Sequence, residues 1–403
     1  MLLTKKESQM IAYVLFFGSA ILFATIDIYV PSLPDMQVFF KTSQDMMQWT
    51  LTLNLLGVAM TGLFFGPLGD HFGRKKLIQI NLVVYLMGTL MCIYSLDIRI
   101  FMVGRLMQAC GSSAQAVVGM AIIADLFRGV ERARVLSITG IIYPIAFSCA
   151  PILGAELSIR YGWQSSFVFL FTGAVIYFCL FWAYVPETLS KDKRHALSFM
   201  KIFRNYGLFL KNKLFILYCS IHALTISVFM LYVANASFIY KNQMGLDMKT
   251  YVYFQAVPSV FQILFTIVAR HVLKNHGMRT SFLIGGWGYG ISFISMLIML
   301  LFFSSNPYVM CAATCIPYIA SAFVLAVAVT KATELFPHMA GTSSAVFSFL
   351  RTILCGVLLG CGTIFLDTDV LQVYPYMMAI ILVILGVIAY ILHFSLKADT
   401  QHS

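Results

Sequence analysis

The stretch GPLGDHFGRKK, residues 66–76, lies between two long apolar segments and indicates how the chain crosses a membrane. It combines glycines with one acid, Asp70, and ends in three consecutive bases. The segments on either side, 46–68 and 77–95, are each near the roughly 20 residues that a helix needs to cross a bilayer. The stretch therefore predicts a short polar loop between two transmembrane helices.

The composition of the whole chain also indicates a membrane protein. Of its 403 residues, 60% are hydrophobic and 11% are charged, and the mean hydropathy is +0.87. Soluble domains carry about 25% charged residues, so this surface would not stay dissolved in water. The alternation of a membrane barrel is absent, which leaves helices as the spanning element.

Apolar blocks of similar length recur along the chain. We predict an all-α integral membrane protein with twelve transmembrane helices, at 10–39, 46–68, 77–95, 100–125, 134–157, 163–185, 214–239, 250–270, 279–303, 307–330, 340–365 and 370–394. We expect Pro31 and Pro34 to bend the long first helix rather than end it. Thr42 to Asp45 provide N-cap chemistry for the second helix.

The net charge of +11 follows the membrane topology. With both termini in the cytoplasm, 20 of the 27 Lys and Arg fall in cytoplasmic segments, as the positive-inside rule requires. Two more, Arg105 and Arg351, lie inside spans. The basic excess is therefore a topology signal, and we expect no nucleic-acid partner. Lys5 and Lys6 also fit a signal peptide, but the apolar run is too long, so we expect an uncleaved first span.

The longest polar stretch divides the spans into two sets of six. We predict an N-terminal bundle at 1–189, a basic cytoplasmic linker at 190–213 and a C-terminal bundle at 214–403. Apolar residues at helical spacing in the linker fit a helix lying on the anionic inner leaflet, and a plain tether is the alternative. Two six-helix halves around a central site are typical of secondary transporters that work by rocking.

The loop between spans two and three suits a conformational latch. Its small residues let helix ends approach, and its acid can pair with bases or with a helix N-terminus. An ordinary positively charged cytoplasmic loop is the alternative. The candidate latch residues are Gly66, Asp70, Gly73, Arg74 and Lys75.

These residues carry a resemblance to a known family. The pattern G-x-L-x-D-x-x-G-R-K is similar to the signature loop of the major facilitator superfamily, although His71 stands where the family usually has Arg. In span four, RLMQACG resembles the R-x-x-Q-G element of the family. D-x-Y-x-P-x-x-P, from Asp27 to Pro34, and FPHMAGTSSA, 336–345, resemble the bicyclomycin-resistance (Bcr/CflA-type) branch of drug–proton antiporters.

The resemblance implies a fold and a function. It implies two six-helix bundles in a bacterial inner membrane, acting as a monomer without a cofactor. It further implies that protons entering drive the export of a drug or small metabolite by alternating access. Span five carries APILGA, 150–155, in which Pro151 and Gly154 match the antiporter element of the superfamily. A kinked packing helix is the alternative there.

One acid lies near the middle of a predicted span. The other fifteen Asp and Glu can be placed in loops or at span ends, whereas Asp27 lies inside the first span. A carboxylate at the bilayer centre costs on the order of 3 kcal/mol, and a low dielectric favours its neutral form, so Asp27 is the candidate proton-coupling residue. Arg105 is its candidate partner, and a purely structural ion pair between the two is the alternative.

Arg351 is the second unusual charge, because no acid lies in the predicted spans of the second half. It can face water, carbonyls, a first-half acid or a substrate anion, and the last would favour an anionic metabolite or siderophore, exported or taken up. We expect His222 to be a hydrogen-bonded interfacial residue rather than a proton relay. The remaining candidates for substrate binding are Tyr29, Asn54, Gln115, Tyr232 and Asn235.

Other classes of protein lack their motifs in this sequence. An intramembrane enzyme would need HExxH or a paired serine motif, an ATP-driven pump would need a Walker A loop, and a channel would need a selectivity filter. All nine cysteines lie in predicted spans without a CxxC, which favours packing over a metal site. We therefore predict a transporter of a small molecule rather than an enzyme.

Overall fold

The structure is a computed structural model, and it is helical in almost all of the chain that it describes. The described residues are 5–127, 129–189, 207–303, 305–336, 340–363 and 370–399. The chain divides into two compact units, Met1–Phe199 and Met200–Ser403. The division falls inside the predicted linker 190–213, of which 190–206, including most of the predicted interfacial helix, lies outside the described residues.

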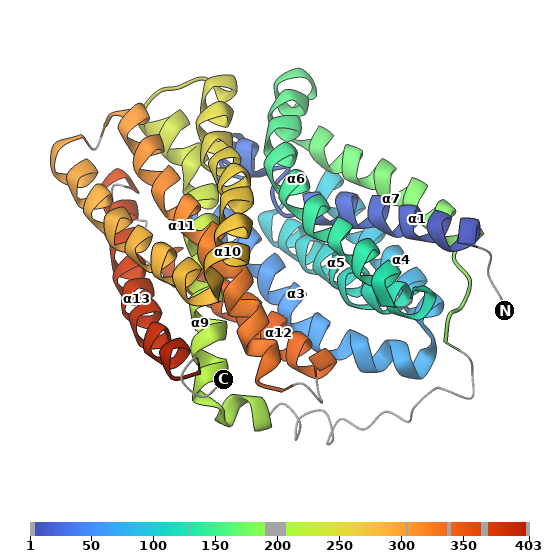
Figure 1. Cartoon of the computed structure of the whole chain (residues 1–403). Helices are drawn as coiled ribbons and strands as arrows, with labels where there is room; N and C mark the ends of the chain where they lie inside the picture. Colours follow the sequence, from blue (N-terminus) through green and yellow to red (C-terminus); the bar gives the residue numbers. More distant parts are fainter. Residues whose placement is uncertain are drawn as a thin grey trace. The chain divides into compact units, whose positions relative to one another are not determined.

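Unit 1 contains the helices drawn from blue to green in Figure 1. Its elements are α1 (Lys5–Ala24), the 3-10 turn η1 (Val30–Ser32), α2 (Leu33–Phe40), α3 (Gln44–Phe72), α4 (Arg74–Tyr94), α5 (Ile98–Leu126), α6 (Gly129–Tyr161) and α7 (Gln164–Tyr184). Helix α5 packs against α4, α3 and α1, and α7 packs against α1 and α4. The core of the unit lies among these helices.

Unit 2 continues from yellow-green to red in Figure 1. Its elements are α9 (Lys213–Ser237), the π-helical turn η3 (Phe238–Gln243), α10 (Met248–Phe302), α11 (Pro307–Glu334), α12 (Ala340–Thr363) and α13 (Val370–Asp399). Helix α9 packs against α11, α12 and α13, and α10 packs against α11 and α13.

The helices agree with the predicted spans. Within the described part of the chain, ten helices are long and apolar enough to cross a membrane. One of these, α10, contains the two predicted spans 250–270 and 279–303, which are separated by a non-helical Gly277 with a φ of +80°. Helix α6 adds the predicted span 134–157.

The first predicted span differs from the expectation of a bent but continuous helix. Helix α1 ends at Ala24, and the chain passes through turns before it resumes as η1 and α2. Pro31 lacks the N–H group that a continuous helix would direct to the carbonyl of Asp27, and this carbonyl instead accepts from the N–H of Val30 in a turn. This break after α1, residues 25–29, places Asp27 on turns rather than inside a helix.

The close packing of α4 on α5 depends on two glycines. A Cβ atom on Gly88 would lie 2.7 Å from the carbonyl oxygen of Gly104, so only glycine permits this separation. The contact brings the next residue along α5, Arg105, into the interior of unit 1, where its side chain is fully buried. At the start of α3, Ser43 accepts a hydrogen bond from the N–H of Met46, which confirms the predicted cap.

Candidate functional site

The turn after α1 positions the candidate proton-coupling residue. The N–H of Asp27 donates to the carbonyl of Ala24 at 3.2 Å, and the carbonyl of Asp27 accepts from the N–H of Val30 at 3.1 Å. The side chain is 1% exposed. Neither of its carboxylate oxygens has a hydrogen-bond partner among the residues that the structure describes.

Arg105 lies in the same buried region. Its Nη1 donates to the carbonyl of Thr25 at 3.0 Å and to Oε1 of Gln108 at 2.7 Å, and its Cζ lies 4.4 Å from the centre of the Tyr29 ring. Among the residues that the structure describes, its Nε and Nη2 have no hydrogen-bond partner. The direct ion pair with Asp27, considered from the sequence, is not formed in this structure, and Nη1 donates to neutral acceptors.

A hydrogen-bond network holds Arg105 in place. Nε2 of Gln108 donates to the hydroxyl of Thr89 at 2.9 Å, and Nδ2 of Asn54 donates to the carbonyl of Arg105 at 2.9 Å. The hydroxyls of Thr25 and Tyr85 also hydrogen-bond to each other. The network joins α3, α4 and α5 to the break after α1. Isolated Thr and Tyr residues gave no signal in the sequence that would have identified them.

Tyr29 completes the cluster beside the break. Its hydroxyl hydrogen-bonds to Thr50 at 2.8 Å, and its ring lies 6.1 Å from that of Phe101 and 5.5 Å from that of Phe167. The ring therefore carries a cation on one side and aromatic neighbours around it. Among the predicted substrate-binding residues of unit 1, Tyr29 and Asn54 lie in this cluster with Arg105.

Gln115 occupies a different place in unit 1. Its Nε2 donates to the carbonyl of Leu15 and to the hydroxyl of Ser19, each at 3.2 Å, and its Oε1 accepts from Tyr177. The amide thus links α5 to α1 and α7. The structure does not bring Gln115 together with the cluster around Arg105.

Helix α6 touches the break at the predicted antiporter element. A Cβ atom on Gly154 would lie 1.6 Å from the carbonyl oxygen of Ile28, the residue that follows Asp27. Pro151, one turn earlier on α6, is also buried. The element APILGA therefore contacts the chain directly beside the buried carboxylate.

The signature loop is shorter than expected. Helix α3 extends to Phe72, so Gly66 and Asp70 are helical, and the turn is formed by Gly73 alone with a φ of +97°. Glycine adopts this conformation without the strain that a Cβ atom causes. Because Gly73 has no side chain, it cannot cap the N-terminus of α4.

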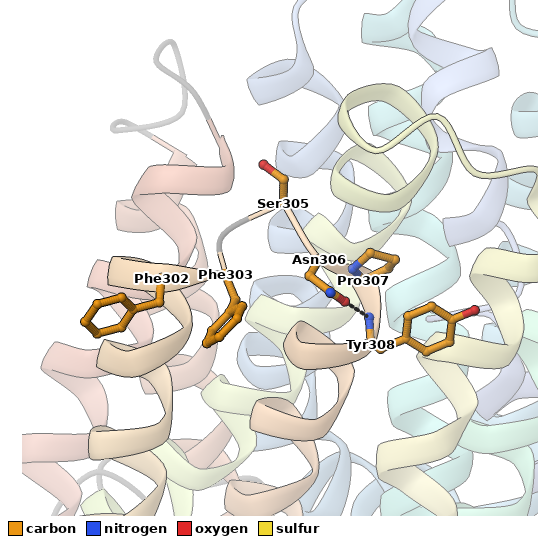
Figure 2. A pocket seen from close by; sticks show the side chains of 6 residues that line it. All are labelled: Phe302, Phe303, Ser305, Asn306, Pro307 and Tyr308. Atoms are coloured by element: carbon orange, nitrogen blue, oxygen red, sulfur yellow. Dashed lines mark hydrogen bonds between the residues drawn. The ribbon is translucent and has the colours of Figure 1, made fainter.

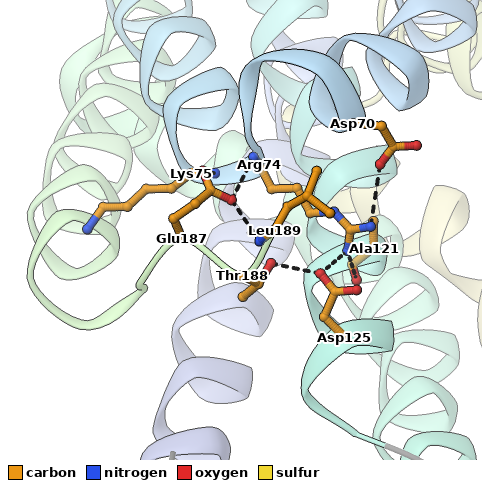
Figure 3. Close-up of polar contacts among 8 residues, drawn as sticks. All are labelled: Asp70, Arg74, Lys75, Ala121, Asp125, Glu187, Thr188 and Leu189. Carbon is orange, nitrogen blue, oxygen red and sulfur yellow. Dashed lines mark hydrogen bonds and ion pairs between the residues drawn. The ribbon is translucent and has the colours of Figure 1, made fainter. Parts of the chain in front are cut away.

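Arg74 is the centre of the predicted latch (Figure 3). Its guanidinium donates to the carboxylate of Asp125 and to the carbonyl of Ala121, and its Nη2 lies 3.4 Å from Oδ1 of Asp70. The hydroxyl of Thr188 donates to Asp125 at 2.8 Å. These contacts tie α3, α4 and α5 to the segment that follows α7.

Glu187 supplies the missing cap of α4 (Figure 3). Its carboxylate accepts from the N–H groups of Arg74 at 3.0 Å, of Lys75 at 3.2 Å and of Leu189 at 3.1 Å. Nζ of Lys75 donates to the carbonyl of Trp182 at 3.0 Å. Glu187 and Asp125 were not among the predicted latch residues, although both are acids that lie near bases at predicted cytoplasmic ends of spans.

The unit 2 candidates lie on two helices. The hydroxyl of Tyr232 donates to the carbonyl of Phe254 at 3.1 Å, and Nδ2 of Asn235 donates to the carbonyl of Leu231 at 2.8 Å, both near the end of α9. Arg351 is half-buried in the middle of α12.

A surface pocket occurs at the turn between α10 and α11 (Figure 2). Its lining residues are Phe302, Phe303, Ser305, Asn306, Pro307 and Tyr308. Asn306 caps α11 by accepting from the N–H of Tyr308 at 3.0 Å. None of the lining residues is ionisable near neutral pH, so the buried cluster of unit 1 is the stronger candidate site. No group of three potential metal ligands occurs among the described residues.

Comparison with known proteins gives consistent matches. The family described as Major Facilitator Superfamily matches residues 15–360. An uncharacterized MFS-type transporter, YdgK, of Bacillus subtilis is 28% identical over 71% of this chain and 68% of its own length. The bicyclomycin resistance protein homolog of Haemophilus influenzae is 25% identical over 81% of this chain and 82% of its own length.

Among solved structures, the crystal structure of a D-xylose-proton symporter superposes with a TM-score of 0.77. The match covers 93% of this chain and 96% of the symporter at 14% sequence identity. At that identity, the likeness concerns the fold.

Proposed function

This chain belongs to the Major Facilitator Superfamily of membrane transporters, and we propose that it exports a drug or small metabolite in exchange for protons. The family match and the relatives confirm the resemblance inferred from the signature loop, the helical membrane fold and the choice of a transporter over an enzyme. A small molecule is therefore its cargo. We further propose that it is a monomer in a bacterial inner membrane with both termini in the cytoplasm.

The observation that carries the proposal is the isolated carboxylate of Asp27. A buried polar group without a hydrogen bond costs about 1–3 kcal/mol, and an ionised one costs more, so such groups are rare away from functional sites. Protonation removes the charge and lowers this cost. None of the described neighbours of Asp27 donates a hydrogen bond that would stabilise its ionised carboxylate. The environment therefore favours the protonated form.

Arg105 provides the opposite charge for the deprotonated state. Its Nε and Nη2 are buried and have no acceptor in the described part of the chain, while Nη1 donates to Thr25 and Gln108. When the carboxylate of Asp27 loses its proton, the unsatisfied donors of Arg105 offer it an ion pair. The exchange of partners would move the break relative to α5, and α6 would follow through the contact at Gly154. This is the proposed link between the proton and the helices.

Two features suggest which solutes to test. The printed name of one relative refers to bicyclomycin resistance, which makes bicyclomycin the first probe. Arg351 in unit 2 favours a second candidate, a proton-coupled transporter of an anionic metabolite or a siderophore, in either direction. In proton-driven export the substrate leaves the cell as a proton enters, whereas in proton-driven uptake the substrate and the proton both enter.

Inverted membrane vesicles test the proposal directly. With a pH gradient established across the vesicles, addition of bicyclomycin should dissipate the gradient when the wild-type protein is present. Asp27→Asn should abolish this response and the resistance of an efflux-deficient host, with unchanged amounts of protein in the membrane. Asp35→Asn, an exposed acid on α2, is the matched control and should behave as wild type. Proton-dependent export by Asp27→Asn would refute the assignment.

A further inference from the structure

Gln255 of α10 is a buried amide whose hydrogen bonds are not made within the described protein. Its side chain is 4% exposed, and neither Oε1 nor Nε2 has a hydrogen-bond partner among the residues that the structure describes. Buried polar atoms of side chains have a partner in the large majority of cases. An interior amide with neither end bonded therefore marks a position where a partner is expected to bind.

Pro258 interrupts the hydrogen-bond ladder of α10 beside this amide. Because proline has no N–H, the carbonyl of Phe254 cannot receive the usual helical bond from the residue four positions later. That carbonyl accepts instead from the hydroxyl of Tyr232 at 3.1 Å and from Sγ of Cys311 at 3.5 Å. The backbone gap left by the proline is thus filled by distant side chains, whereas the adjacent side chain of Gln255 is left without partners.

A second glutamine on the same side of α10 provides a comparison. Gln262 follows Gln255 by seven residues, which is about two helical turns. Its Nε2 donates to Oγ of Ser321 on α11 at 3.1 Å. The packing of unit 2 therefore provides a partner for one of these two amides and leaves the other able to bind a partner from outside the chain.

Aromatic rings lie beside Gln255. The ring of Tyr240 in η3 lies 5.3 Å from that of Phe254, with 15° between the two planes, and 6.4 Å from that of Tyr251, with 30° between the planes. Phe254 directly precedes Gln255, and Tyr251 lies one turn before it on the same side of α10. Turns of the π-helical type, such as η3, frequently occur at functional sites. A flat ring bound at the amide would therefore have aromatic neighbours on which to stack.

The amide itself defines the hydrogen-bonding groups of a matching ligand. A carboxamide presents an acceptor oxygen and a donor NH₂ group in one plane. A cyclic amide or imide holds its N–H and a C=O on the same edge of the ring, so these two groups can pair with Oε1 and Nε2 of Gln255 in two parallel hydrogen bonds. An ionised carboxylate has no donor for Oε1, and a quaternary ammonium ion has no acceptor for Nε2.

We propose that Gln255 forms a subsite that binds the N–H and C=O edge of a cyclic amide or imide in the transported solute. The inference rests on the proposed function in taking the bound solute to be the cargo. Because Gln255 is covered in this structure, the solute reaches it in another conformation of the alternating-access cycle. The helical bond that Pro258 lacks removes one restraint on such a change in α10. The subsite belongs to unit 2, whereas the proton site with Asp27 belongs to unit 1.

Binding by the full-length protein in detergent tests the subsite without transport. The probes are phenylsuccinimide and N-methyl phenylsuccinimide, which share their rings and carbonyls and differ in the imide N–H. We expect phenylsuccinimide to raise the thermal unfolding midpoint of the wild-type protein and the N-methyl compound to leave it unchanged. Equal shifts with both compounds, or no shift with either, would overturn the subsite, and this comparison requires no variant.

Gln255→Met keeps an unbranched side chain and removes the donors and the acceptor. It should weaken phenylsuccinimide binding at least tenfold and raise the unfolding midpoint of the ligand-free protein, because an unsatisfied buried amide is gone. Gln262→Met is the matched control, and it should lower the ligand-free midpoint, because a bond to Ser321 is lost, yet retain binding. A lower ligand-free midpoint for Gln255→Met would show that the amide is satisfied in the folded protein, for example by water. That result, or normal phenylsuccinimide binding by Gln255→Met, would refute the proposal.

Asp27→Asn separates this inference from the proposed function. The variant should lose proton coupling in vesicles yet bind phenylsuccinimide as the wild-type protein does. Loss of binding in Asp27→Asn would tie the ligand to the proton site and would contradict a separate subsite in unit 2. Retained proton coupling together with normal binding would refute the role of Asp27 and leave the subsite supported.

Discussion

Gly154 of α6 lies against the chain segment that carries Asp27, and replacing it with Ala should disturb the candidate proton site. The new Cβ atom would lie 1.6 Å from the carbonyl oxygen of Ile28 and 2.7 Å from its carbonyl carbon. Ordinary contacts begin near 3.4 Å, so α6 and the break must separate by 3.4 − 1.6 = 1.8 Å. Overpacking of a tight interior typically costs 1–3 kcal/mol, and a clash with backbone atoms belongs at the upper end, about 3 kcal/mol.

Two measurements follow the effect of this variant. The unfolding midpoint in detergent should fall, and the dissipation of a pH gradient by substrate should be lost, because the displaced chain carries Asp27. Gly290→Ala on α10 is the control, since no atom lies within 4 Å of its added Cβ and it should unfold and transport as wild type. Wild-type unfolding and transport by Gly154→Ala would show that the close approach of α6 to the break does not exist.

Three other substitutions test separate parts of the structure. Arg105→Lys keeps the charge but loses the planar donor fork, and it should destabilise unit 1 by about 2–3 kcal/mol in thermal unfolding; an unchanged midpoint would contradict the network described above. Glu187→Gln removes the charged cap and should cost about 1 kcal/mol, measured as faster hydrogen exchange at the first amides of α4, and normal exchange there would exclude the capping role. Hydrogen bonds from the side chain and backbone of Thr250 lower the pKa of Asp247, so its carboxylate stabilises the start of α10 above its unfolded pKa of about 3.9. This contribution is lost as the pH falls through the lower folded pKa, and the difference in unfolding midpoint between wild type and Asp247→Ala should shrink there; a constant difference would refute it.

Much of the fold was predictable because the bilayer restricts the choices. Spans had to be helical and about 20 residues long, and apolar runs therefore located them well. The glycine and the bases of the signature loop marked the turn at Gly73. Ser43 was identifiable as a cap because its effect is local to the sequence. These features depend on neighbours within a few residues.

Features that depend on distant residues were not predictable. The two prolines after Asp27 indicated a bend, but the turns between Ala24 and Val30 that end the helix also pack against Gly154 of α6, which is distant in the sequence. Glu187 caps a helix that begins 113 residues earlier in the sequence. Such pairings require the fold before they can be recognised.

The cap from Glu187 also determines where mechanical load enters unit 1. The chain reaches the segment that joins the two units directly after Leu189, whose N–H is bound by the same carboxylate. Tension along that segment therefore acts first on two sets of hydrogen bonds. Glu187 is bound to α4, and Thr188 is bound to Asp125 of α5. A pull from the second half of the chain is shared among several helices instead of unwinding the last turn of α7.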